Sequence, residues 1–88
     1  MDLVALTPAE LTIMAARRLL AEANAEALAL RRRVEVLAHA TDWRSRATDA
    51  YRAAIASLCD ELAALIHHID LADADLAEVL RWLGDVAR

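Results

Sequence analysis

Apolar residues recur at alternating intervals of three and four through two long stretches of the chain, and this repeat restricts the fold more than any other feature. The first stretch carries it at Ile13, Ala16, Leu20, Ala23, Ala27, Leu30, Val34 and Leu37. The second carries it, with two successive steps of four around Leu58, at Ala47, Tyr51, Ala54, Leu58, Leu62, Leu65, Ile69, Ala72, Leu76, Val79 and Leu83. An apolar seam that repeats every seven residues is typical of helices packed along their length. The sequence therefore predicts an all-α protein.

Capping residues indicate where the two helices begin and end. The segment Thr7–Glu10 (TPAE) has the pattern of a capping box with proline at the first helical position. Thr41, Asp42 and Ser45 interrupt the apolar repeat and are good helix N-caps, while Gly84 favours a helix stop. We therefore predict one domain over 1–88, with a first helix over about 8–39, a turn over about 40–45 and a second helix over about 46–83.

The composition calls for more contact than one pair of helices offers. The chain has 88 residues, of which 59% are apolar and only 3% aromatic. A core of this size gives marginal stability, and one internal seam cannot hide so much aliphatic surface. Leu11, Leu19 and Leu28 lie off the seam and widen the apolar surface further. We expect an antiparallel helix-turn-helix hairpin that pairs with another hairpin into a four-helix bundle.

Charge and cysteine content exclude several classes of protein. The net charge is −4, which disfavours a general nucleic-acid binder, and the single cysteine, Cys59, allows no internal disulfide. Uncharged runs are far shorter than the ~20 residues that span a bilayer. We expect no membrane span, synthesis in the cytoplasm, and a route without a signal peptide if the protein is secreted. Arginines near the turn and acidic residues in the second helix favour antiparallel packing of two hairpins.

The titratable residues do not form a recognisable catalytic or metal-binding motif. His67 and His68 point about 100° apart on a helix, and neither Glu61 nor Asp70 completes a HExxH-type arrangement with them. The arginines of the segment 31–33 fan around the helix axis and are expected to form a solvated, salt-bridging face. We therefore expect no enzymatic activity, no cofactor and no metal.

Trp43 is the most informative single residue because it lies at the predicted turn. An indole there can either close the end of the hairpin's own core or enter a groove on a partner, and one residue can do both. Trp82, near the end of the second helix, is expected to be a packing residue that covers the open end of the bundle.

The segment Trp43–Tyr51 (WRSRATDAY) resembles the Trp-x-Gly turn, the alanine-rich helix start and the following aromatic residue of the WXG superfamily of small type VII secretion proteins. The chain is similar to that family in length, in the placement of the tryptophan and in its two flanking helices. It departs from the family at Ser45, which stands in place of the usual glycine. The family's export signal, a tyrosine followed four residues later by an acid, has no match, because Ile55 lies four residues after Tyr51.

The resemblance implies a small non-enzymatic protein of a type VII secretion system. Its partner would be another helical hairpin, identical or different, or the N-terminal helical domain of a larger secreted toxin, and the pair would engage the secretion machinery. The alternative is a cytosolic homo-oligomeric coiled-coil adaptor or regulator with no export role. In either case we expect the partner to contact Trp43, Ser45, Tyr51, Leu20, Leu30, Leu58, Leu62 and Leu65.

Overall fold

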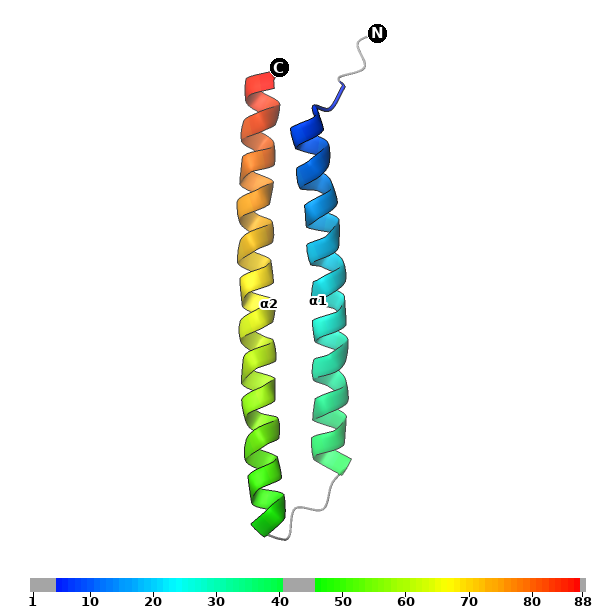
Figure 1. Ribbon diagram of the computed structural model, residues 1–88, viewed down its shortest axis with the longest axis vertical. Helices are drawn as coiled ribbons and strands as arrows, with labels where there is room; N and C mark the ends of the chain where they lie inside the picture. The colour runs from blue at the N-terminus through cyan, green and yellow to red at the C-terminus, as the bar shows by residue number, and fades with distance from the viewer. Residues whose placement is uncertain (1–4, 41–45, 88) are drawn as a thin grey trace.

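Two long antiparallel helices make up the described part of the chain. The computed structural model describes residues 5–40 and 46–87, and the side chains of 5–40 and 48–86. Helix α1 spans Pro8–Ala40 and helix α2 spans Arg46–Ala87. The start of α1 and the end of α2 lie at the same end of the molecule, the open end (Figure 1), and the molecule measures 69 × 19 × 14 Å. The predicted all-α hairpin is confirmed, while its pairing into a four-helix bundle stays a prediction.

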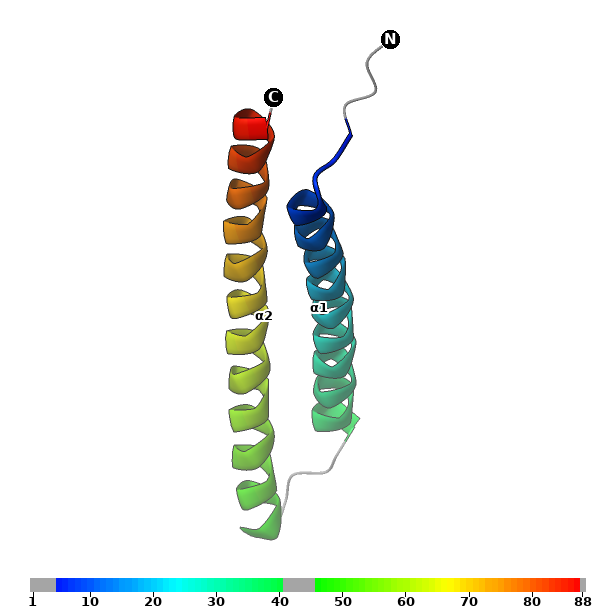
Figure 2. The same cartoon turned by 45° about the horizontal axis from the view of Figure 1, so that its top comes forward.

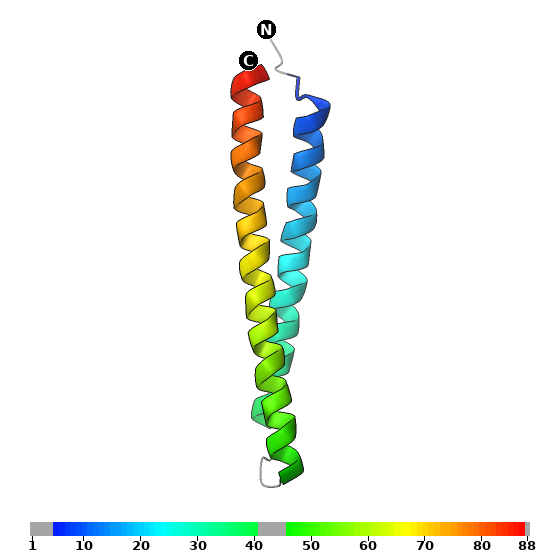
Figure 3. The ribbon, with the colours of Figure 1, turned by 60° about the vertical axis from the view of Figure 1, so that its left-hand side comes forward.

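The two helices remain in contact along their length. They lie side by side when the molecule is tilted (Figure 2), and after a turn about the long axis α2 passes in front of the lower part of α1 (Figure 3). Long helices that cross at a shallow angle pack their side chains like those of a coiled coil. The hairpin is therefore one layer of two helices, with both broad faces open.

The predicted capping box forms at the start of α1. The Glu10 amide donates to Thr7 Oγ1 at 3.1 Å, and the Thr7 amide donates to Glu10 Oε1 at 3.2 Å. These bonds satisfy two backbone donors that a helix start leaves unpaired. The Leu11 amide then donates to the Thr7 carbonyl at 3.0 Å, which closes the first turn.

The predicted stop at Gly84 is wrong, because α2 continues to Ala87. Glycine ends a helix readily when it takes a positive φ, and no glycine among the described residues does so. Gly84 is half-buried and keeps the helical conformation instead. Lacking a side chain, it costs helix stability without breaking the helix.

The predicted repeat forms two rows of apolar residues on each helix, and within each row the residues are mostly seven apart. One row of each helix is confirmed as the core between the helices. Among the described residues, the apolar side chains less than one tenth exposed are Ala27 and Val34 on α1 and Leu62 and Ile69 on α2. All four belong to the predicted repeat. They form the narrow core between the helices.

The other predicted row does not lie in the seam that the two helices share. For most of its members, the residue that follows in the sequence is the one that is half-buried there. On α1, Ala23 is exposed and its neighbour Asn24 is half-buried. On α2 the same displacement leaves Leu65 exposed and Ile66 half-buried. It recurs at Leu37 and Ala38, Leu58 and Cys59, and Val79 and Leu80. Each helix is therefore rotated about its own axis so that a partly polar row faces the other helix and an apolar row is exposed to solvent.

Candidate partner-binding interface

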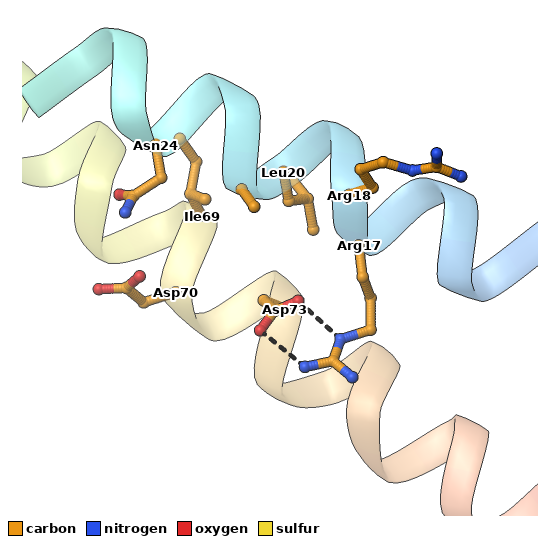
Figure 4. A pocket seen from close by; sticks show the side chains of 8 residues that line it. Arg17, Arg18, Leu20, Asn24, Ile69, Asp70 and Asp73 are labelled. Carbon is orange, nitrogen blue, oxygen red and sulfur yellow. Dashed lines mark hydrogen bonds and ion pairs between the residues drawn. The ribbon is translucent and has the colours of Figure 1, made fainter.

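One of the two broad faces of the hairpin, here called a flank, is polar and carries the ion pair that joins the helices. This polar flank consists of Arg17, Arg18, Asn24, Asp70 and Asp73. Arg17 crosses from α1 to α2 and donates from Nε to Asp73 Oδ1 at 2.8 Å and from Nη2 to Oδ2 at 3.2 Å, whereas Arg18 extends away (Figure 4). The two bonds fit the planar guanidinium to the carboxylate. They therefore fix the position of one helix along the axis of the other.

The same contact changes the acidity of both groups. The hydrogen bond from Arg17 lowers the pKa of Asp73, with a further contribution from the arginine's charge, while desolvation opposes the shift. The bond to Asp73 also raises the pKa of Arg17. Both side chains are more than a third exposed, so solvent screens their attraction. We conclude that the ion pair sets register more than it adds stability.

Asn24 adds a second polar group to the polar flank. Its Oδ1 atom is buried without a hydrogen-bond partner in the described structure. A single polar residue in an apolar seam lowers stability but disfavours other alignments of the helices. The apolar repeat gives no sign of Asn24, Arg17 and Asp73, because none of the three belongs to it. The seven-residue interval between Arg17 and Asn24 is the signal that could have revealed this row.

The opposite flank is apolar and hollowed where alanines lie. A hollow of about 690 Å³ opens between Ala16, Leu19 and Ala23 of α1 and Ala72, Leu76 and Val79 of α2. Ala23 also borders a smaller hollow of about 270 Å³, which extends to Leu30 on α1 and Leu65 on α2. The two hollows share Ala23, and we call the surface that they line the apolar flank. Glu26 and Asp75 lie at its edges.

The apolar flank leaves large aliphatic side chains in contact with solvent. Leu19 is 65% exposed, and Leu30, Leu65 and Val79 are each between 43% and 47% exposed. A scattered exposed leucine is ordinary, but a contiguous row contributed by two helices marks an interaction surface. The apolar flank is therefore the candidate binding site.

Two smaller patches combine apolar surface with charge at opposite ends of the hairpin. Near the turn, a basic patch on α1 consists of Arg32, Arg33, Val36, Leu37 and Ala40. Near the open end, an acidic patch on α2 consists of Asp75, Glu78, Val79 and Trp82. Trp82 is 59% exposed in the single hairpin, and its predicted cover of the open end of the bundle stays a prediction. A large exposed indole beside a valine is typical of interface surfaces.

The predicted partner-contact residues fall into three groups. Leu30, Leu58, Leu65 and Tyr51 are exposed, and Leu30 and Leu65 line the apolar flank. Leu20 is half-buried, and Leu62 is only 6% exposed because it belongs to the core between the helices. Trp43 and Ser45 lie outside the described residues. Their predicted role in binding stays a prediction.

The groups that could carry chemistry remain apart. Within residues 5–40 and 46–87, no cluster of three or more histidine, cysteine or acidic side chains could hold a metal ion. The rings of His67 and His68 lie 6.1 Å apart on the exposed side of α2, and Cys59 is a half-buried free thiol. Neither described helix is long and apolar enough to cross a membrane.

Comparison with known proteins finds no match to a family model, to a curated protein or to a solved structure.

Proposed function

We propose that this chain is a small non-enzymatic protein of a type VII secretion system, and that it binds a partner hairpin or the N-terminal helical domain of a secreted toxin. Binding would cover the apolar flank and complete a four-helix bundle. The bundle would then offer a composite surface to the secretion machinery, by a route that needs no signal peptide. Support for the export role comes from the resemblance of the segment Trp43–Tyr51 to the WXG superfamily.

The observation that carries the binding function is the uncovered apolar flank. Leu30, Leu65 and Val79 are nearly half exposed although they follow the heptad repeat, and polar residues occupy part of the shared seam instead. An isolated hairpin gains nothing from this arrangement, because apolar burial is the main source of helix-bundle stability. A second pair of helices would bury the same row.

An adaptor or regulator without an export role would bind through the same flank, so binding alone does not separate the two functions. Secretion does. The test is to express the tagged chain in its native host and measure it in the culture medium with and without the secretion ATPase, using a cytoplasmic protein as the lysis control. We expect release to depend on the ATPase. Equal amounts in both media would refute the export role.

A matched pair of variants links release to the apolar flank. Leu65 and Leu71 are both leucines of α2, exposed by 47% and 50%, but only Leu65 lines the apolar flank. Leu71 is two residues from the buried Ile69, which places it about 200° around the helix on the outer side. We expect Leu65→Glu to abolish partner binding and release and Leu71→Glu to preserve both. Equal effects of the two variants would contradict the proposed site.

A further inference from the structure

We propose that the bond between Arg17 and Asp73 keeps the apolar flank exposed, and that without this bond each helix turns about its own axis and hides the flank inside the hairpin. The proposal names the regulation of the binding site described above, so it rests on the partner-binding part of the proposed function. Its basis is that each helix carries two alternative rows of residues that fit the seam, and only one of them contains the ion pair.

The seam of the structure consists of two rows on each helix. The shared row, which both arrangements would use, is buried or half-buried and consists of Ile13, Leu20, Ala27 and Val34 on α1 and of Ile55, Leu62, Ile69 and Leu76 on α2. The residues four positions after its members form the inner row. The inner row consists of Arg17, Asn24, Arg31 and Ala38 on α1 and of Cys59, Ile66, Asp73 and Leu80 on α2.

The alternative to the inner row contains only apolar side chains. This outer row lies three positions after the shared row and consists of Ala16, Ala23, Leu30 and Leu37 on α1 and of Leu58, Leu65, Ala72 and Val79 on α2. Intervals of three and of four both fit a heptad seam. Neighbouring residues lie about 100° apart around a helix, so a turn of each helix by about half that angle would replace the inner row with the outer row.

The outer rows of the two helices already lie at matching heights. Ala16 and Ala72 line the larger hollow of the apolar flank, and Ala23 and Leu65 line the smaller one. The helices would therefore turn without sliding along one another. We call the arrangement in the structure open, because it exposes the outer row, and the alternative closed.

Apolar burial and the ion pair favour different arrangements. On α1 the closed arrangement would bury Leu30 and Leu37, now 43% and 49% exposed, in place of arginines of the inner row. It would also move Arg17 and Asp73 away from each other and break the two bonds that join them across the seam (Figure 4). A partner on the apolar flank buries the same leucines while the helices stay open. Partner binding and the ion pair therefore stabilise the same arrangement.

The reactivity of introduced cysteines reports which row faces solvent. In a Cys59→Ala background, a single cysteine replaces either Leu65 of the outer row or its neighbour Ile66 of the inner row. In the dilute full chain, we expect Leu65→Cys to react with a maleimide about tenfold faster than Ile66→Cys, because exposure limits the reaction. Adding Arg17→Gln should reverse that order. An unchanged ratio of the two rates would overturn the proposal.

Two control positions separate a turn of the helices from a general loosening. Leu62→Cys lies in the shared row and should react slowly with and without Arg17→Gln. Leu71→Cys lies on the outer side of α2 and should react fast in both cases. If Arg17→Gln makes Leu62→Cys react as fast as Leu71→Cys, the hairpin opens instead of turning, which contradicts the proposal.

A charge swap tests whether the bond itself is responsible. Arg17→Asp and Asp73→Arg each remove the pair, whereas the double variant restores it with the charges exchanged. We expect the double variant to return the ratio of the Leu65→Cys and Ile66→Cys rates to within about threefold of the ratio in the unswapped chain. A double variant that behaves like Arg17→Asp alone would show that the pair does not hold the open arrangement.

The proposal and the proposed function fail on different results. A labelling ratio that does not respond to Arg17→Gln removes the regulation and leaves the apolar flank as an exposed binding site. Equal effects of Leu65→Glu and Leu71→Glu on partner binding and release contradict the binding site, while the turn of the helices measured by labelling stands. Circular dichroism of each variant confirms that its helices are retained.

Discussion

Arg17 on α1 and Asp73 on α2 are joined by two parallel hydrogen bonds of 2.8 and 3.2 Å across the seam of the hairpin. The bonds require the two helices to be rolled so that Arg17 and Asp73 face one another. That roll turns the apolar row on the other side of the seam toward solvent. A polar contact thus lies on one flank, and an exposed apolar row lies on the other.

The ion pair predicts a small loss of stability in acid. The pKa of Asp73 lies below its ordinary value of 3.8 in the folded state, because Arg17 donates to its carboxylate. Stabilisation is therefore present at pH values well above the ordinary pKa of 3.8 and is lost as the pH falls through the lowered pKa. Urea denaturation at pH 6 and pH 2.5 should show a smaller acid loss in Asp73→Asn than in the wild type. An equal loss would mean that the pair does not contribute.

Replacing Asn24 with leucine should stabilise the hairpin. Among the described residues no group donates to the buried Oδ1 of Asn24, and removing an unsatisfied buried polar group is worth about 1–3 kcal/mol. We expect Asn24→Leu to raise the urea midpoint and to loosen the alignment of the helices, which would broaden amide resonances in NMR spectra. A lower midpoint would show that the Asn24 amide makes a stabilising contact in solution.

The sequence was sufficient to predict both helices, their antiparallel order and the capping box at Thr7, because apolar periodicity and capping are local properties of the chain. The roll of the helices was not predictable in the same way. Two adjacent heptad rows can both serve as a seam, and the arrangement in the structure brings together Arg17 and Asp73, which are 56 residues apart. Part of the predicted seam, including Leu30 and Leu65, therefore lies on the apolar flank and not between the helices.

Gly84 offers a direct test of the end of α2. The helix continues through this residue to Ala87 with no positive φ at glycine, so alanine fits the same backbone conformation. Gly84→Ala should stabilise the protein by about 0.5–1 kcal/mol because alanine loses less backbone entropy in a helix. Thermal unfolding followed by circular dichroism measures the change. Destabilisation would indicate a stop at Gly84 or a close contact that excludes the methyl group.

The prediction for Trp43 concerns a residue outside the described structure. We expect its indole to be largely buried, by the hairpin's own end or by a partner, and Trp43→Ala to cost about 2–4 kcal/mol in folding or association. Trp82 is 59% exposed and would dominate the response to a quencher, so the measurement needs a Trp82→Phe background. Full quenching of the remaining fluorescence by acrylamide would contradict the burial of Trp43.

The two adjacent heptad rows of α2 should differ in what they stabilise. Leu62 is 6% exposed between the helices, whereas Leu65 is 47% exposed on the apolar flank. We expect Leu62→Ala to lower the free energy of unfolding by about 2–4 kcal/mol at any protein concentration, since it leaves a cavity in the hairpin core. Leu65→Ala should have little effect on a dilute chain and should weaken association at higher concentration. Urea denaturation at 1 and at 100 µM, on the order of the range over which a weak dimer forms, separates the two effects. If Leu65→Ala destabilises the dilute chain as much as Leu62→Ala does, the helices are rolled the other way and the apolar flank is part of the hairpin's own core.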